Sequence, residues 1–302
     1  MAYLKDTKIA EEILRLRISQ LLINEEYKAG KFKIPVHLAL GHEAIAAAMN
    51  HILAGEDKLI LSHRNMAYNL AQLGKLRPIL DEYLLRSTGL AGGRLGSMNL
   101  IDPARHVIYS SSILGNNFPV ASGIAMAEKM KEKKGVVFVF GGDGSMEEGS
   151  FYESLVLAKT LGLRLVFMIE NNEWSLGTSI SERRCNIDLK QMAGSVNISY
   201  FKLDGNHCHK YIEMLKGIKG EALRSDDPAC VEITVKTLGD RRADDGRYIN
   251  YHAGPAPTVD MAKVILRENE DDPVFVIKQE IGSDEFGKLS QTVMSELRNE
   301  IY

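Results

Sequence analysis

Two continuous apolar runs at the centre of the chain constrain its fold more than any other feature. Residues 136–140 and 165–169 are rich in β-branched and aromatic side chains, and the amphipathic segment 151–161 separates them. Unbroken apolar runs of this length are typical of strands buried on both faces, as in a parallel sheet. A helix between two such strands predicts a right-handed βαβ unit. A further run at 229–235 predicts a third strand, so the expected fold class is α/β, a parallel sheet flanked by helices.

Apolar periodicity and Gly or Pro stops predict the remaining helices. They are expected at residues 5–30, 42–53, 62–85 (interrupted near Gly74 and Pro78), 121–134, 260–269 and 284–301. No repeat period and no Pro/Ser-rich linker divides the chain. The expected organisation is therefore a single domain spanning 1–302, with a helical extension from about residue 258.

Composition and charge narrow the class of protein. The chain has 37 Lys and Arg against 40 Asp and Glu, a net charge of -3, which argues against a nucleic-acid-binding protein. Its 302 residues hold three Cys and no C-x-x-C pair, which favours a reducing compartment. We find no 18-residue apolar run and no apolar signal core in the first eight residues. We therefore expect a cytoplasmic enzyme that binds neither nucleic acid nor membrane.

Polar residues follow the first two predicted strands at the points where they end. The first strand is followed by residues 141–145, with the sequence Gly-Gly-Asp-Gly-Ser, and the second by residues 170–174, with Glu-Asn-Asn-Glu-Trp. The carboxyl ends of parallel strands meet at one edge of the sheet, so Asp143 and Asn172 should lie close together. A carboxylate and an amide oxygen suit Mg²⁺, and flanking glycines let the backbone approach a diphosphate closely.

This pattern of Gly-Asp-Gly followed by Asn-Asn resembles the thiamine diphosphate signature. Over most of residues 10–235, the chain resembles the alpha subunits of the first components of 2-oxo-acid dehydrogenases of the pyruvate, branched-chain and acetoin types. The segments that carry the resemblance are 37–44, 62–64, 92–99 and 142–183. Within the first of these segments, His42 is expected at the surface or at an interface.

The resemblance implies roles for individual residues. Asp143 and Asn172 would bind Mg²⁺ through their side chains, and Trp174 through its backbone carbonyl. Arg64 would hold the diphosphate, for which its guanidinium fork is suited. The other cofactor-binding residues implied are Gly142, Gly144 and Ser145, beside the diphosphate, and Ile113 and Gly115, beside the aminopyrimidine ring.

The chain also departs from the family pattern. His63 replaces the usual Tyr before Arg64, Asn99 replaces a His, and residues 236–240 replace a His-Gly-His-Ser loop. His252 lies in a segment that is similar to the end of the cofactor-binding domain of transketolases. We therefore expect His63 and His252 to be the catalytic histidines.

The resemblance further implies a separate beta-type subunit, because the chain shows no second strand-helix array that could bind the pyrimidine ring. The expected assembly is α₂β₂, with thiamine diphosphate and Mg²⁺ held between chains and a Glu supplied by the beta-type subunit. The leading hypothesis is decarboxylation of a 2-oxo acid with acyl or aldehyde transfer. One alternative is a split transketolase-type subunit that moves a two-carbon ketol unit between sugars. Another is a non-catalytic regulatory or scaffolding homologue.

Overall fold

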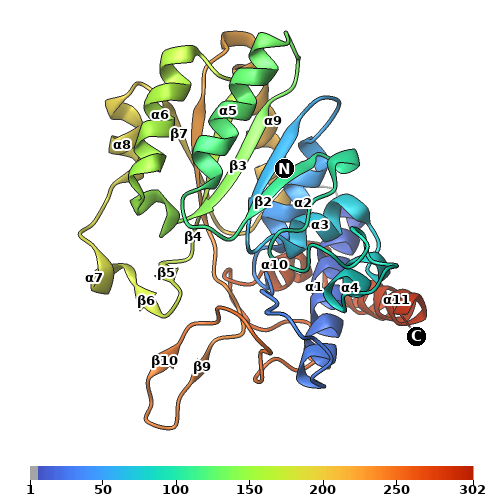
Figure 1. Ribbon diagram of the computed structural model, residues 1–302. Helices are drawn as coiled ribbons and strands as arrows, with labels where there is room; N and C mark the ends of the chain where they lie inside the picture. The colour runs from blue at the N-terminus through green and yellow to red at the C-terminus, as the bar shows by residue number, and fades with distance from the viewer. Residues whose placement is uncertain (1–5, 302) are drawn as a thin grey trace.

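A six-stranded parallel sheet forms the centre of the computed structural model, which describes residues 6–301 (Figure 1). The strands follow the order β2-β1-β3-β4-β8-β7, and each neighbouring pair is parallel. Their bounds are β1 Lys58–Ser62, β2 Val107–Ser111, β3 Val137–Gly142, β4 Leu165–Asn171, β7 Ser199–Leu203 and β8 Ala229–Thr234. The expected fold class is therefore confirmed. The three strands predicted from the sequence, β3, β4 and β8, lie side by side in the sheet.

Helices cover both faces of the sheet, and alternation along the strands explains why both faces are apolar. Phe138 and Phe140 of β3 pack in one core with α1, α2, α3 and α9. Val137 and Val139 point to the opposite face and pack with α5, α6 and α8. The helices are α1 Thr7–Lys28, α2 Glu43–Ile52, α3 Met66–Leu73, α4 Arg77–Tyr83, α5 Asn117–Met130, α6 Gly149–Leu161, α7 Ile180–Arg183, α8 Leu189–Ser195, α9 Cys208–Ser225, α10 Pro273–Ile281 and α11 Ser283–Ile301. Across residues 6–301, none of these helices combines the length and apolar character needed to cross a bilayer.

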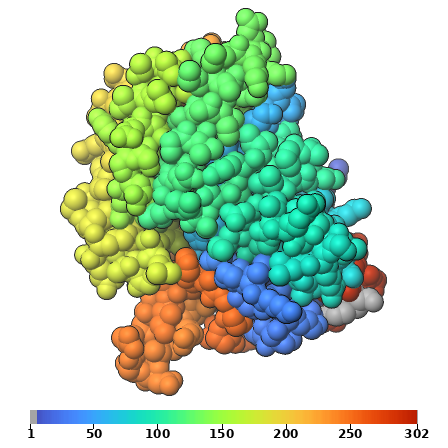
Figure 2. All heavy atoms as spheres, in the orientation of Figure 1, coloured from blue at the N-terminus to red at the C-terminus, as the bar shows by residue number. Residues whose placement is uncertain are grey.

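Two small antiparallel hairpins lie outside the central sheet. One pairs β5 Trp174–Ser175 with β6 Thr178–Ser179, directly after β4. The other pairs β9 Arg241–Arg242 with β10 Tyr248–Ile249, and Figure 2 shows it standing out from the body of the molecule. Short 3₁₀ turns occupy Pro103–Arg105 and Ser145–Glu147.

The predicted helix at 260–269 is wrong, because this segment forms turns. The Asp272 carboxylate accepts hydrogen bonds from the backbone N–H groups of Leu266 and Arg267, at 2.7 and 3.1 Å. It also caps α10 by accepting from the N–H of Val274 at 2.9 Å. Turns around this buried carboxylate therefore replace the expected helix, and the helix α10, which was not predicted, begins one residue after it.

Other helix boundaries also differ from the expectation. Helix α5 begins at Asn117, four residues earlier than expected, and ends at Met130, before Lys131, Lys133 and Lys134. Glu132, with a φ of 55°, turns the chain out of the helix before Gly135 is reached. The expected helix at 62–85 is divided into α3 and α4, and its first residue, Ser62, is the last residue of β1. Residue 5 of the first predicted helix lies outside the described residues.

A buried arginine ties the N-terminal helix to two distant segments. Arg17 of α1 is fully buried and donates to the Glu43 carboxylate at 2.7 and 3.1 Å. It donates to the Asp272 carboxylate at 2.9 and 3.2 Å, and to the carbonyl oxygen of Val264 at 2.9 Å. Arg17 holds the pKa of the Asp272 carboxyl below its ordinary value even though burial alone would raise it. Glu43 in turn accepts from the Gly41 N–H at 2.8 Å, which anchors the loop before α2.

Candidate functional site

A cavity lies where the order of the strands reverses along the sheet. β1 neighbours β2 on one side and β3 on the other, and the later strands β4 and β8 continue outward from β3. Open parallel sheets bind ligands beyond the carboxyl ends of the strands at such a switch point. A cavity of about 370 Å³ lies there, lined by residues that follow β1, β2, β3 and β4.

All the site residues predicted from the sequence line this one cavity. They are His63, Arg64, Ile113, Gly115, Gly142, Asp143, Gly144, Ser145, Asn172, Trp174 and His252. Residues from position 63 to position 174 meet because four parallel strands end at the same edge, and His252 reaches the cavity from the segment after β10. Their individual roles stay predictions.

Asp143 and Asn172 form the polar end of the cavity. The Asp143 side chain is 1% exposed, and the guanidinium of Arg183 pairs with it. Burial raises the pKa of the Asp143 carboxyl, an effect that Arg183 opposes. The Asn172 carbonyl oxygen Oδ1 accepts from the Trp174 N–H at 3.0 Å, and its Nδ2 donates to the Thr237 hydroxyl at 2.9 Å.

Glycines bring the backbone into close contact around this end. A Cβ on Gly144 would lie 2.5 Å from Ser175 Oγ, and one on Gly115, where φ is +71°, would lie 2.7 Å from the Glu148 side chain. A Cβ on Gly142 would meet nothing nearer than 3.9 Å, so this backbone faces open space in the cavity. The loop after β3 can therefore admit a large group against its main chain.

Arg64 lies two residues after the end of β1 and joins three segments. Its guanidinium donates to the carbonyl oxygens of Leu38, at 2.5 Å, and His252, at 3.1 Å, and lies 5.9 Å from the centre of the Tyr251 ring. The residue is 7% exposed and borders the cavity. A buried guanidinium gives this part of the cavity a positive charge.

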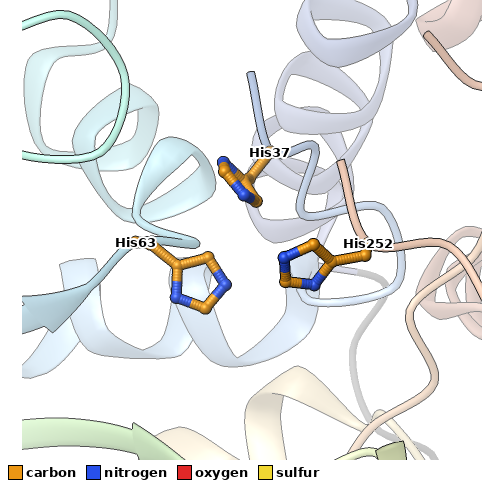
Figure 3. A group of neighbouring side chains, drawn as sticks. All are labelled: His37, His63 and His252. Carbon is orange, nitrogen blue, oxygen red and sulfur yellow. The ribbon is translucent and has the colours of Figure 1, made fainter. Parts of the chain in front are cut away.

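The rings of His37, His63 and His252 converge at the cavity (Figure 3). The ring centres of His37 and His63 are 4.8 Å apart, those of His37 and His252 are 5.1 Å apart, and those of His63 and His252 are 5.5 Å apart. Burial, assisted by the charge of Arg64, lowers the pKa of His37 to about 3 and that of His63 to about 2. The pKa of His252 is lowered by the same two causes. The rings are therefore neutral at neutral pH.

Two of these rings retain hydrogen-bonding capacity. His37 Nδ1 and His63 Nε2 are buried and have no hydrogen-bond partner among the residues described. Sequence reasoning identified His63 and His252 but assigned no role to His37, although His37 belongs to the segment 37–44. The approach of His252 to His37 and His63 depends on the path of residues 236–252, which local sequence does not encode.

The expectation that His42 lies at the surface or at an interface is wrong. His42 is 2% exposed, and its Nδ1 lies 2.7 Å from Glu170 Oε1, which also accepts from the Tyr68 hydroxyl at 2.6 Å. The other ring nitrogen, Nε2, lies 3.0 Å from the Thr237 hydroxyl. Sequence reasoning missed Glu170 and Thr237 as well. The signal that could have found Glu170 is its place as a charged residue at the end of a buried strand.

The fold and the cavity define the class: an α/β protein whose ligand cavity combines a buried acidic end, a glycine-lined backbone and a cluster of neutral histidines at the switch point. The model of the family described as "Dehydrogenase E1 component" matches residues 14–249. The chain belongs to this family. It is similar to the pyruvate dehydrogenase E1 component subunit alpha of Rickettsia bellii (strain RML369-C), with 30% identity over 276 residues, covering 88% of this chain and 83% of the relative. The corresponding subunit of Rickettsia prowazekii (strain Madrid E) is 32% identical over 250 residues, covering 82% of this chain and 75% of the relative.

The fold also resembles that of transketolase. A crystal structure of transketolase from Pichia stipitis matches with a TM-score of 0.65 and 16% identity, over 96% of this chain and 46% of that chain. The chain thus spans about half the length of the transketolase polypeptide. At this identity the likeness concerns the fold alone. The resemblance to 2-oxo-acid dehydrogenase alpha subunits is confirmed, and the family match favours it over the transketolase alternative.

Proposed function

We propose that this chain is the alpha-type subunit of a thiamine diphosphate-dependent enzyme that decarboxylates a 2-oxo acid and transfers the resulting acyl or aldehyde unit. It would hold the diphosphate end of the cofactor through Mg²⁺. The observation that carries the proposal is the meeting of Asp143 and Asn172, 29 positions apart in the sequence, at one glycine-lined cavity. Family membership supports the same activity.

The residues at the acidic end fit a magnesium diphosphate. Asp143 offers a buried carboxylate, Asn172 an amide oxygen and Trp174 a backbone carbonyl, and hard oxygen ligands of this kind suit Mg²⁺. The open backbone at Gly142, and the N–H groups of Gly144 and Ser145 beyond it, suit the approach of phosphate oxygens. This donor set would leave the remaining positions of the ion to phosphate oxygens and water.

Arg64 would add to the binding of the diphosphate, and Ile113 and Gly115 would bind the aminopyrimidine end of the cofactor. Arg64 brings a buried positive charge to the cavity, which favours an anionic group such as diphosphate. Ile113 and Gly115 follow β2 and line the cavity where the aminopyrimidine ring would lie. When bound, thiamine diphosphate supplies the electron sink for cleaving a carbon–carbon bond next to a carbonyl.

The three histidines would face the substrate. His63 and His252 stay the predicted catalytic residues, and we add His37 to them because its ring completes the same cluster. Neutral imidazoles can donate or accept a hydrogen bond at a substrate carbonyl or carboxylate. The neighbouring guanidinium of Arg64 favours an anionic substrate over a metal cation in this cluster.

A beta-type partner would complete the site, and we propose an α₂β₂ assembly. The partner would carry the pyrimidine-binding domain and its Glu. Three large apolar side chains support this, because they lie exposed at the cavity: Ile113 is 68% exposed, Leu114 49% and Leu176 66%. Apolar groups gathered around a cavity are typical of a surface that another chain covers.

The experiment is isothermal titration calorimetry of Mg²⁺ and thiamine diphosphate with the chain and its beta-type partner, for the parent and for Asp143→Asn. Replacement of a charged ligand of the ion by a neutral amide should weaken Mg²⁺ binding by at least about 100-fold, since even residues behind the ligands cost about 10–100-fold. Glu153→Gln, the same chemical change at an exposed position of α6, should bind as the parent does. A parent assembly that binds no cofactor would refute the proposal.

The reaction itself is tested by turnover. The parent assembly should decarboxylate 2-oxo acids in the presence of an artificial electron acceptor. Turnover of ketose phosphates without turnover of 2-oxo acids would support the split transketolase instead. An Asp143→Asn assembly as active as the parent would instead support a non-catalytic role for this cavity.

A further inference from the structure

The amide of Asn172 is held from both sides. Its Oδ1 accepts from the Trp174 N–H at 3.0 Å, and its Nδ2 donates to the Thr237 hydroxyl at 2.9 Å. An amide can bind a cation only through its oxygen, so the orientation of this side chain decides whether it is a ligand.

Thr237 belongs to a buried chain of hydrogen bonds that ends at a carboxylate. Thr237 is 3% exposed, and its hydroxyl lies 3.0 Å from Nε2 of His42, which is 2% exposed. His42 Nδ1 lies 2.7 Å from Glu170 Oε1. The contacts thus run without interruption from Asn172 through Thr237 and His42 to the Glu170 carboxylate.

The Thr237 hydroxyl accepts from Asn172 Nδ2 and is itself held by its contact with His42 Nε2. If the Asn172 amide were flipped, this hydrogen bond from Nδ2 would be lost. At the other end, Nδ2 would face the Trp174 N–H, donor against donor. The Trp174 N–H thus rejects the flipped orientation, and Thr237 holds Nδ2 on the opposite side.

We infer that Thr237 and His42 are positioning residues that present Oδ1 of Asn172 to the ion held with Asp143. The inference rests on the proposed function, because it assigns these residues to the same Mg²⁺ site. Neither residue binds the ion. They act through Asn172, as hydrogen-bonding groups behind metal ligands commonly do.

The test compares Thr237→Val with Thr237→Ser in the full assembly with its beta-type partner. Valine has the shape of threonine but leaves Asn172 Nδ2 and His42 Nε2 without a partner, whereas serine keeps the hydroxyl. We expect Mg²⁺ affinity, measured calorimetrically at saturating thiamine diphosphate, to fall by about 10–100-fold in the valine variant. The serine variant should bind nearly as the parent does. Thr258→Val changes an exposed threonine, whose hydroxyl donates only to the Asp240 carbonyl, and serves as the matched control.

A second variant separates orientation from general damage. In Asn172→Asp, both side-chain oxygens are equivalent, so there is no amide to orient. Thr237→Val should then weaken Mg²⁺ binding far less in the Asn172→Asp background than in the parent, as a double-mutant cycle measures. Equal losses in both backgrounds would overturn the inference, and so would a serine variant as weak as the valine one. A parent assembly that binds no Mg²⁺ would instead refute the proposed function itself.

Discussion

Replacement of Gly41 by alanine should disrupt the contact between the loop before α2 and the loop after β8. Gly41 has a φ of +95°, and a Cβ built on it would lie 1.9 Å from the carbonyl oxygen of Lys236 and 3.2 Å from Leu238 Cγ. Beside this contact, the Leu238 N–H donates to the carbonyl oxygen of Leu40 at 2.8 Å. The two loops cannot stay in place around a side chain at position 41.

The size of the effect follows from these distances. An ordinary contact begins near 3.4 Å, so the Lys236 carbonyl must recede by about 1.5 Å. Forcing in a methyl group costs about 1–3 kcal/mol, the lost backbone hydrogen bond about 1 kcal/mol, and the positive φ about 1–2 kcal/mol. We expect Gly41→Ala to lower the free energy of unfolding by about 3–6 kcal/mol.

Gly30→Ala is the matched control. Gly30 also has a positive φ, +71°, but a Cβ there would meet nothing within 4 Å. In this variant the free energy of unfolding should fall only by the contribution of the positive φ, about 1–2 kcal/mol. Urea unfolding followed by circular dichroism measures both variants at one protein concentration, because association with another chain adds to apparent stability. Equal losses in the two variants would refute the reasoning. Displacement of Lys236 also moves Thr237, so Gly41→Ala should weaken Mg²⁺ binding while Gly30→Ala should not.

Two further predictions concern buried charge and pH. Arg17→Leu leaves two buried carboxylates without their cation and should lower the free energy of unfolding by about 3–5 kcal/mol. Arg15→Leu removes a partly exposed ion pair and should lower it by about 1 kcal/mol or less in the same urea assay. Similar losses at the two positions would contradict this account of the core. His37 and His63 have pKa values of about 3 and about 2 in the folded chain, far below the ordinary value of 6.5. At pH values between about 3 and about 6.5, the unfolded chain therefore binds more protons than the folded chain. The free energy of unfolding should fall as the pH drops through this range. Ring resonances of either histidine that titrate near pH 6.5 by NMR would disprove the lowered pKa values.

Where the local sequence pattern itself indicates burial, the structure was predictable from the sequence. The apolar runs that became β3, β4 and β8 predicted buried parallel strands, and their ends predicted that Asp143 and Asn172 would meet. Local pattern sufficed there because a parallel sheet brings all its carboxyl ends to one edge. The strands β1, β2 and β7 were missed. Their short segments mix polar with apolar residues, and strand pairing rather than local propensity defines them.

Residues whose surroundings come from distant segments were not predictable. His42 was predicted at the surface or at an interface because its partner, Glu170, lies 128 positions away in the sequence. No local pattern indicates this pairing. The segment 260–269 has helical periodicity, yet it forms turns. Two of its N–H groups donate to the buried carboxylate of Asp272. In both cases a tertiary hydrogen bond to a buried carboxylate decides the structure. Such bonds outweigh local propensity because an unpaired buried charge costs several kcal/mol.

The same buried groups place charges of both signs along the cavity. Asp143 and Glu170 contribute carboxylates, and Arg64 contributes a guanidinium beside the histidines. Burial lowers the pKa of the three histidines, and the charge of Arg64 lowers it further, so the group that would attract an anion also favours neutral imidazoles beside it. Replacement of Arg64 should therefore alter the binding of anionic groups and the protonation of the histidines together, which makes Arg64 and the three histidines a single electrostatic unit.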